Sequence, residues 1–560
     1  MLALSTSEVP LKPVGQPYKR QLAESAYDAI VIGSGIGGLS AAALLAKHAG
    51  QRVLVLERHY TAGGFTHVFR RPGYEWDVGV HYIGGVGPGQ PVRAAFDHLT
   101  EGRLQWNPMP DEYDRIRIGE RAYGFPSGGE RFRERMKQYF PSEGKAIDRY
   151  LAAVRAAAGA SGSYFAEKAV PAPIARLAGG LMRRRFLRYA NQTTAEVLGQ
   201  FTSNTELIAV LTGQWGDYGL PPEQSSFAMH GIVVHHYLEG AGYPVGGASE
   251  IAAGIAPIIE RAGGTILVGA EVCRILLDHK GSAVGVCMAD GREYRARTVI
   301  SDAGAFNTFA RLLPPESAAS QPLLRQVKGI SHSMSHVCLY VGLKQDGPET
   351  EAGNLWIYPD ADHDGNLARF LKEPEAPFPV IFISFPSAKD PTFASRYPGR
   401  STIEVVAPAP YAWFERWAGE RWKRRGPGYE DLKDRFTARL LDALERHVPS
   451  TRGRVDYAEL STPLSTRHFA NYPRGEIYGL SATPERFRIR GLGARTPIPN
   501  LYLTGQDTCV AGVTGALIGG AITASAILRR NLVSAIMKPA KPGTFPASPV
   551  SNGSCLKPSA

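Results

Sequence analysis

The stretch Tyr27-Asp-Ala-Ile-Val-Ile-Gly-Ser-Gly-Ile-Gly-Gly-Leu39 decides the fold of this chain. Its apolar run Ala-Ile-Val-Ile is typical of a buried parallel strand, and an Ala- and Leu-rich helix is expected from Ile36 to His48. Between them Gly33, Gly35 and Gly38 permit a tight turn, a close approach to a pyrophosphate and close packing of helix on strand. The phosphates would lie on the free N–H groups at the start of that helix. The sequence therefore predicts a dinucleotide site.

Three further segments decide which dinucleotide is expected. A second predicted strand ends at Glu57, which is placed to bind a ribose 2′-hydroxyl. Gly63-Gly64 follow, and they resemble the Gly-Gly pair that lies against the cofactor in flavin-binding oxidoreductases, where side chains would collide with it. Far along the chain, Asn500-Leu-Tyr-Leu-Thr-Gly-Gln-Asp507 is a further predicted strand. Gly512-Val-Thr-Gly515 then opens a helix whose N–H groups and dipole would face an electron-rich ring edge. This order predicts FAD, bound by a Rossmann domain assembled from discontinuous segments.

The composition limits the remaining possibilities. A chain of 560 residues is too long for one core and predicts two or three domains. Its net charge of +11 favours anionic surfaces, but no compact basic motif with interleaved aromatics suggests a nucleic-acid partner. The five cysteines are scattered and include no C-x-x-C pair, which argues against a dithiol centre or clustered zinc site and favours a reducing compartment. The uncharged run 510–528 resembles a membrane span, yet its Gly, Ala and Thr content favours a buried helix.

The chain resembles the phytoene desaturase, carotenoid isomerase and retinol saturase group of flavoproteins, over residues 27–531. The matching residues are Gly33-Ser-Gly-Ile-Gly-Gly38, Glu57, Gly63-Gly64, Asp77-Val-Gly-Val-His-Tyr-Ile-Gly84, Tyr243-Pro-Val-Gly-Gly247 and Thr504-Gly-Gln-Asp507. Within the group, the sequence at residues 81–84 and 504–507 is most similar to that of the retinol saturases. The residues expected to hold FAD are Gly33, Ser34, Gly35, Ile36, Gly37, Gly38, Glu57, Arg58, Gly63, Gly64, Val272, Gly505, Asp507, Gly512, Val513 and Thr514, with Val272 included because the resemblance implies a backbone contact with the adenine.

The resemblance implies an α/β fold, in which the FAD-binding Rossmann domain adjoins an α+β substrate domain with a mixed sheet and covering helices. A strand meander over residues 270–288 is predicted inside the cofactor domain. The expected divisions are a flexible leader at 1–26, FAD-binding parts at 27–105, 246–310 and 476–533, substrate-domain parts at 106–245 and 311–475, and a flexible tail at 534–560.

The favoured activity is FAD-dependent saturation of a C=C bond in a lipophilic retinol- or carotenoid-like polyene. A carotenoid desaturase, a cis–trans isomerase and a flavin-binding protein without turnover are the alternatives. Because no second G-x-G-x-x-G follows a predicted strand, electrons are expected to come from an external partner such as NAD(P)H, a quinone, a reductase or oxygen. Saturation by hydride also needs a proton for the neighbouring carbon. His81, Tyr82 and Tyr478 are the candidate acids, with structural or packing roles as the alternative.

Two stretches favour peripheral association with an anionic membrane. Residues 171–189 have the pattern of a basic amphipathic helix, and residues 413–425 combine Trp and Phe with Lys and Arg. The alternative for each is a solvated charged face over core aromatics. The expected location is therefore cytoplasmic and peripheral to a membrane, and the oligomeric state is not predicted. The pair His235-His236 is expected on a strand beside the substrate cavity, where neighbours face opposite ways and hold no metal.

Overall fold

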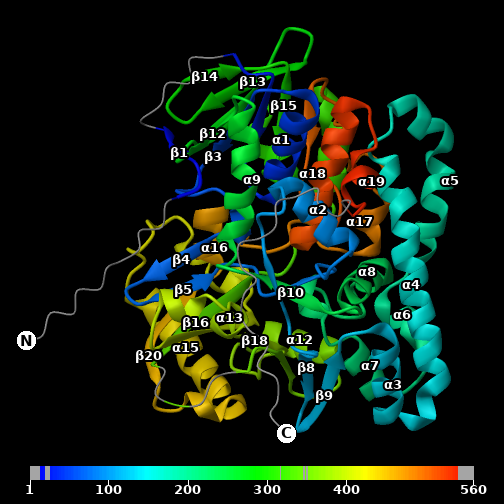
Figure 1. Ribbon diagram of the computed structural model, residues 1–560, viewed down its shortest axis with the longest axis vertical. Helices are drawn as coiled ribbons and strands as arrows, with labels where there is room; N and C mark the ends of the chain where they lie inside the picture. The colour runs from blue at the N-terminus through cyan, green and yellow to red at the C-terminus, as the bar shows by residue number, and fades with distance from the viewer. Residues whose placement is uncertain (1–12, 19–25, 316, 345–346, 348–350, 540–560) are drawn as a thin grey trace, which may run out of the picture.

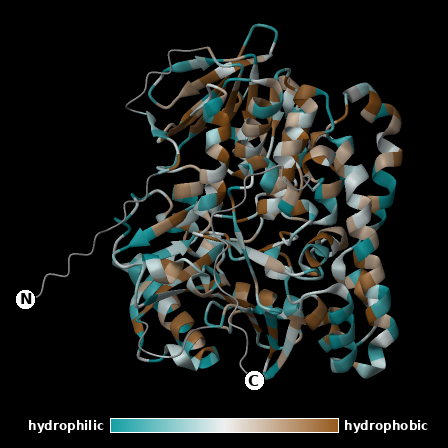
Figure 2. Cartoon of the chain, in the orientation of Figure 1, coloured by the Kyte–Doolittle hydropathy of each residue, from teal (hydrophilic) through white to brown (hydrophobic). Residues whose placement is uncertain are grey.

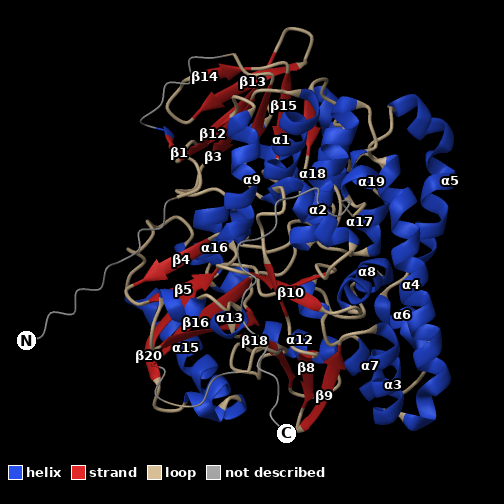
Figure 3. Cartoon of the chain, viewed as in Figure 1, coloured by secondary structure: helices blue, strands red, loops and turns tan. Residues whose placement is uncertain are grey.

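The computed structural model describes residues 13–18, 26–315, 317–344, 347 and 351–539. Two main sheets lie one above the other in Figure 1, and a flank of long helices covers one side of both, as Figure 3 shows. The glycine-rich turn follows β2 (Ala29–Ile32), a strand of the upper sheet.

The upper sheet is parallel throughout and has six strands in the order β1-β11-β3-β2-β15-β21. They are β1 (Gln16–Pro17), β2 (Ala29–Ile32), β3 (Val53–Glu57), β11 (Thr265–Val268), β15 (Thr298–Ser301) and β21 (Leu501–Leu503). In register, Ile32 pairs with both Leu56 and Ser301. The carboxyl ends of the central strands therefore meet at one edge, which is where ligands bind in open α/β sheets.

Two helices cross close to this edge. They are α1 (Ile36–Ala49) and α18 (Gly512–Leu528), and both begin near the predicted residue. α9 (Ser249–Arg261) packs on α1 as well. No helix among the described residues is both long enough and apolar enough to span a bilayer, and most of α18 is buried, as predicted.

The lower sheet is mixed and has seven strands in the order β20-β16-β19-β18-β17-β8-β9, of which only β17 and β8 pair in parallel. Its strands are β8 (Glu112–Ile118), β9 (Arg121–Pro126), β16 (His336–Lys344), β17 (Asn354–Tyr358), β18 (Ile381–Ser384), β19 (Arg400–Pro408) and β20 (Val455–Ser461). A predicted meander forms a separate sheet of β12 (Val272–Leu277), β13 (Ala283–Met288) and β14 (Glu293–Arg295). The remaining strands are the hairpin β4 (Val68–Arg71) and β5 (Tyr74–Asp77), and the set β6 (Ile83–Gly84), β10 (Ala241–Pro244) and β7 (Trp106–Pro108).

The other helices pack around both main sheets and form the flank. The longest are α4 (Gly144–Glu167), α5 (Ala172–Ala190) and α15 (Pro427–His447). The others are α2 (Pro91–Thr100), α3 (Gly129–Tyr139), α6 (Thr194–Gly199), α7 (Thr205–Leu211), α8 (Phe227–Tyr237), α10 (Ala305–Asn307), α11 (Gln321–Lys328), α12 (His363–Lys372), α13 (Pro386–Lys389), α14 (Phe393–Arg396), α16 (Pro463–Ala470), α17 (Pro484–Arg488) and α19 (Leu532–Ile536).

Both predicted ends of the fold need correction. Residues Gln16–Pro17 were expected in a leader outside the fold, but they pair with Leu267 and Val268 of β11. The Tyr18 hydroxyl also donates a hydrogen bond to Asp290 Oδ1, at 3.1 Å. At the other end, Ile536 of α19 is buried inside the expected tail. Strand pairing holds Gln16–Pro17, while Tyr18 and Ile536 pack into apolar clusters of the parallel-sheet domain. Residues 1–12, 19–25 and 540–560 of the expected leader and tail lie outside the described residues.

Candidate functional site

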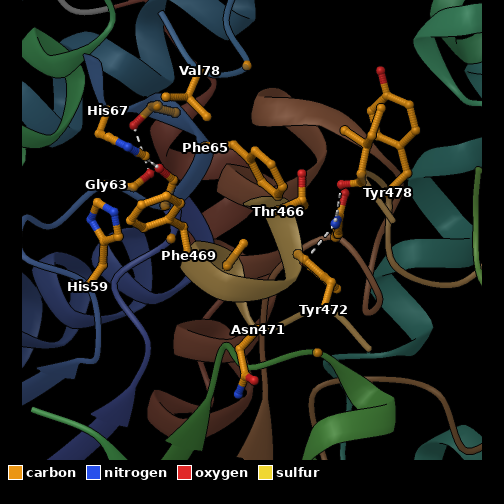
Figure 4. Close-up of a pocket in the computed structure, with 18 of the residues that line it drawn as sticks. His59, Gly63, Phe65, His67, Val78, Thr466, Phe469, Asn471, Tyr472 and Tyr478 are labelled. Atoms are coloured by element: carbon orange, nitrogen blue, oxygen red, sulfur yellow. Dashed lines mark hydrogen bonds between the residues drawn. The ribbon is translucent and has the colours of Figure 1, made fainter. Parts of the chain in front are cut away.

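A cavity of about 600 Å³ lies between the carboxyl edge of the parallel sheet and the lower sheet. Its wall begins at the glycine-rich turn, passes the loop after β3 and reaches β16, β18 and β19. Figure 4 shows part of this wall, where the rings of Phe65 and Tyr472 stack with centroids 5.9 Å apart. The volume is of the size that holds a cofactor or drug-sized ligand.

The glycine-rich turn is shaped by backbone contacts that leave no room for side chains. Gly33 has φ +92°, a conformation that favours glycine. A Cβ on Gly38 would lie 2.4 Å from the Gly33 oxygen, so this glycine lets helix and strand touch, as predicted. A Cβ on Gly37 would lie 2.5 Å from Gly505 Cα, which brings the segment before α18 against the start of α1. Two segments far apart in the sequence, the turn at residues 33–38 and the loop at residues 505–512, therefore lie together. We call this part of the site the glycine cradle.

Glu57 is fixed at the end of β3 by hydrogen bonds to both of its carboxylate oxygens. Its Oε2 accepts from the Ser34 N–H at 2.9 Å and from the Ser34 hydroxyl at 2.7 Å. Its Oε1 accepts from the His59 N–H at 2.7 Å. The Gly63 N–H in turn donates to the Ser34 hydroxyl oxygen at 3.2 Å, so the carboxylate, the turn and the glycine pair form one unit.

The far end of the cradle differs in one respect from the prediction. Gly505, Gly512 and Val513 line the cavity, but both carboxylate oxygens of Asp507 accept backbone hydrogen bonds, from Ala305 at 2.8 Å and Leu480 at 3.1 Å. Asp507 therefore fastens three chain segments together at the wall. Of all the residues expected to hold FAD, only Gly38 and Thr514 are not part of the cavity wall.

Asp302, which the sequence did not single out, lies beneath the turn at the end of β15. Its Oδ2 is 2.5 Å from the position that a Cβ on Gly35 would take. Burial raises the pKa of this carboxyl to about 8, although hydrogen bonds from the Gly38 and Gly35 N–H groups oppose the shift. The acid is therefore neutral at neutral pH, which suits a position beside a pyrophosphate.

These residues fit a flavin dinucleotide. The helices α1 and α18 both start at the cavity without a side-chain cap, so their first N–H groups are free to face a ligand. Gly37 and Gly505 leave the backbone open to close approach, and Glu57 is held where a ribose hydroxyl would meet it. Arg58 and Val272 lie on the wall at the same end.

The other end of the cavity is apolar and aromatic. Its wall includes side chains from the lower sheet and the adjoining loops, namely Trp215, Met334, Tyr340, Trp356, Val380, Phe382 and Val406. We call this part the aromatic chamber. Such a wall favours a lipophilic ligand over a charged one.

His81, one of the candidate acids, lies on the wall of the aromatic chamber, close to a buried acid. Its Nδ1 is 2.8 Å from Oε2 of Glu404, a residue of β19 that is fully buried. Burial, with a smaller effect from Lys389, lowers the pKa of His81 to about 3, and burial raises the pKa of Glu404 to about 8. At neutral pH the imidazole is therefore uncharged.

The other two predicted acids differ in position. Tyr478 lines the cavity, and burial raises the pKa of its hydroxyl. Tyr82 is not part of the wall; its hydroxyl points to Asp114 Oδ2 at 2.9 Å and to Asp217 Oδ2 at 3.1 Å. Of these three, Asp217 is the one that lines the cavity. No motif marked it, because it follows Trp215-Gly216 in a short 3-10 helix with no characteristic spacing.

His235 and His236 belong to helix α8, so their expected place on a strand is wrong. The apolar residues of α8 are buried almost all round, which hides helical periodicity in the sequence. His236 Nε2 accepts a hydrogen bond from the Gly84 N–H at 2.9 Å, and neither histidine lines the cavity. No cluster of potential metal ligands occurs among the described residues.

The two predicted membrane-facing stretches also differ from each other. On α5, Ile174, Leu177 and Leu181 are exposed, the second to 92%. Figure 2 shows hydrophobic segments, in brown, along this outer helix. Arg183 of the same helix is instead buried in an ion pair with Glu167, at 2.8 Å. The aromatic patch expected at residues 413–425 is wrong as a surface: Phe414 and Trp417 are buried in the core under the lower sheet, and Trp422 lines the cavity.

Comparison with known proteins agrees with this geometry. The family model described as flavin containing amine oxidoreductase matches residues 36–528. An all-trans-retinol 13,14-reductase of Danio rerio is 42% identical over 527 residues, covering 90% of this chain and 86% of that protein. A chloroplastic prolycopene isomerase of Arabidopsis thaliana is 29% identical over 525 residues, covering 89% of this chain and 81% of that protein.

Among solved structures, an oxidoreductase from Methanosarcina mazei superposes with a TM-score of 0.58 at 18% identity, covering 90% of this chain and all of that one. This likeness concerns the fold. The family match spans most of the chain, and the reductase relative is similar over nearly its whole length. The chain therefore belongs to the flavin containing amine oxidoreductases, in the group that includes the retinol saturases and carotenoid isomerases, and it is a flavin-dependent oxidoreductase.

Proposed function

We propose that this enzyme uses FAD to reduce a C=C bond in a lipophilic, conjugated isoprenoid, with retinol as the nearest model substrate. The observation that carries the proposal is a single cavity that joins the glycine cradle to the aromatic chamber, in a chain 42% identical to an all-trans-retinol 13,14-reductase. An extended apolar polyene suits such a chamber, because its burial is favourable and requires few polar partners.

The bound flavin would supply two electrons as a hydride, and the chain supplies the rest of the chemistry. The cradle at Gly33–Gly38 and Gly505 would hold the dinucleotide, with Glu57 on the ribose. The aromatic chamber would exclude water and align the polyene. Neutral His81 and protonated Tyr478 are hydrogen-bond donors on its wall, suited to orient a hydroxyl group at the polar end of the substrate.

The electrons that reduce the flavin are proposed to come from outside the chain, from NAD(P)H or a quinone. The glycine-rich turn at residues 33–38 is the one G-x-G-x-x-G that follows a strand in the sequence. A carotenoid cis–trans isomerase is the second candidate, because a prolycopene isomerase is 29% identical over a similar length.

Product mass separates these activities. The holoprotein is photoreduced without oxygen and offered retinol, lycopene isomers and phytoene in turn. A gain of two hydrogens supports saturation, no change in mass with altered retention supports isomerisation, and a loss of two hydrogens with oxidised flavin and an acceptor supports desaturation. Failure of retinol and of every carotenoid to gain hydrogens would refute the proposed reductase.

We further propose that α5 docks on an anionic membrane from which the substrate is taken. Leu177 and Leu181 project from α5 beside exposed arginines, a combination suited to lipid headgroups. Burying one leucine is worth about 1.5–3 kcal/mol, so Leu177→Glu with Leu181→Glu should abolish flotation with phosphatidylserine vesicles. Leu371→Glu, at a leucine of α12 that is 50% exposed, is the matched control. Unchanged flotation of the double variant would contradict the proposal.

A further inference from the structure

Two carboxyl groups lie within hydrogen-bond distance of the Tyr82 hydroxyl. Oδ2 of Asp114 lies 2.9 Å from it, and Oδ2 of Asp217 lies 3.1 Å from it. Asp114 is completely buried, whereas Asp217 is partly exposed to the cavity that its side chain lines. A tyrosine hydroxyl has one proton, so it can donate to only one of the two carboxyl groups.

The hydrogen bonds of Asp114 make it the carboxyl better suited to ionise, because they oppose the rise in its pKa that burial causes. Asp114 Oδ1 accepts from the Asn354 amide at 2.9 Å, and its Oδ2 accepts from the Gln214 amide at 2.7 Å. The ammonium group of Lys389 donates to Oδ1 of the same Asn354 side-chain amide and so adds positive charge close to it. Asp114 therefore has the donors that a carboxylate requires, and Tyr82 completes the set.

Asp217 must then be the protonated partner. With the Tyr82 proton directed at Asp114, an ionised Asp217 would place its oxygen against a lone pair of Tyr82. A protonated Asp217 instead donates its own O–H to that lone pair. Burial first, and then the charge of Asp114, raises the pKa of Asp217 well above its ordinary value. The other titratable groups that interact electrostatically with Asp217 are tyrosines, namely Tyr82, Tyr113, Tyr218, Tyr237, Tyr358 and Tyr478.

Asp217 also differs from the other carboxyl groups on the cavity wall. Glu57 and Asp507 accept backbone hydrogen bonds, Glu459 is paired with Arg71, and Glu271 lies near Arg58. Asp302 lies against the glycine turn. Among the described residues, the one hydrogen-bond partner of the Asp217 side chain is the Tyr82 hydroxyl. Asp217 is therefore a neutral acid on the cavity wall whose proton is not bonded to any residue of the glycine cradle.

We propose that Asp217 is the acid that protonates the substrate carbon, an inference that rests on the proposed reduction of a C=C bond. The O–H bond of Asp217 breaks and a C–H bond forms at one alkene carbon; a reduced flavin held by the glycine cradle would supply the hydride for the other carbon. The alkene would gain two hydrogens and two electrons, and both electrons would come from that flavin. The Tyr82 hydroxyl can then turn its proton to the new Asp217 carboxylate, and solvent reprotonates the acid after the product leaves.

The first test needs no turnover. Infrared difference spectra of the oxidised holoprotein, wild type minus Asp217→Asn, should contain a protonated carboxylic acid C=O band at neutral pH. Tyr82→Phe removes the acceptor of the Asp217 proton and should shift this band. A difference spectrum with a carboxylate band in place of the acid band would overturn the inference, whatever the substrate.

The second test measures turnover of the substrate identified by product mass. Asp217→Asn keeps the size of the side chain but has no acidic proton, so turnover should fall by about 10²- to 10⁴-fold with FAD still bound. Asp217→Glu should recover part of the rate. Asp364→Asn, at a carboxyl on α12 whose pKa burial also raises, to about 6, is the matched control and should leave turnover unchanged.

These outcomes separate the two proposals. Turnover within about threefold of wild type in Asp217→Asn would overturn the role of Asp217 and leave the reductase proposal intact. Absence of hydrogenation by the wild-type enzyme, with the acid band present, would overturn the reductase proposal instead.

Discussion

Replacing Gly37 by alanine tests whether the two ends of the chain form one cofactor cradle. The new Cβ would lie 2.5 Å from Gly505 Cα and 2.6 Å from Gly505 N. Carbon atoms pack about 3.5–4.0 Å apart, so α1 and the loop before α18 must separate by about 1 Å. Both contacting atoms belong to backbone, which cannot move aside as a flexible side chain can.

The size of the effect follows from two opposing terms. Overpacking of this kind costs about 1–3 kcal/mol, and the better helix propensity of alanine returns at most about 1 kcal/mol. Two backbone atoms nearer than 3.0 Å place this clash in the upper half of that range, about 2–3 kcal/mol. Because Gly37 and Gly505 both line the cavity, the net loss of about 1–2 kcal/mol should appear in cofactor affinity. The Kd for FAD should therefore rise about 5- to 30-fold.

The assay titrates the deflavinated protein with FAD and follows the quenching of flavin fluorescence. Gly159→Ala is the matched control, because Gly159 lies within helix α4 and no atom is within 4 Å of its added Cβ. This control should bind FAD as tightly as wild type. Wild-type affinity in Gly37→Ala, or an equal loss in both variants, would refute the shared cradle.

Three further predictions concern buried charges. Glu57→Gln should raise the Kd for FAD about 5- to 150-fold, because an amide NH₂ would face the Ser34 or His59 N–H at a cost of about 1–3 kcal/mol; Glu293→Gln, at a side chain 42% exposed and away from the cavity wall, should leave the titration unchanged. Affinity for FAD should fall as pH rises through about 8, since Asp302 then ionises beside the pyrophosphate, and Asp302→Asn should make the titrations independent of pH in this range. Arg183→Met leaves Glu167 buried without its partner and should lower the free energy of unfolding by about 3–5 kcal/mol in urea denaturation, whereas replacing both residues by methionine should restore most of it. A pH-dependent Asp302→Asn protein, or an Arg183→Met protein as stable as wild type, would contradict the respective argument.

The cofactor half of the site could be predicted from the sequence because local rules determine it. Gly33 needs a positive φ, Gly38 touches the Gly33 oxygen, and Glu57 follows a buried strand; each requirement restricts the residue type at a fixed spacing. The same reasoning misjudged His235 and His236, because a helix buried on most of its surface carries no amphipathic period. Asp507 was recognised at its position, but its bonds to Ala305 and Leu480 depend on the tertiary fold.

The residues of the proposed substrate part of the site could not be predicted from local rules, and Asp217 is an example. The protonation of Asp217 depends on the Tyr82 hydroxyl, on the Asp114 carboxylate and on the two amides that donate to that carboxylate. These groups come from β8, β17 and loops far apart in the sequence. No spacing rule links Tyr82, Asp114 and Asp217, so their chemistry appears only when the fold brings them to one point. Tyr82 was predicted as an acid because of its place near the flavin segment. Its hydrogen bonds instead determine which of the two carboxyl groups, Asp114 or Asp217, keeps its proton. This is why we propose Asp217 as the acid on the cavity wall.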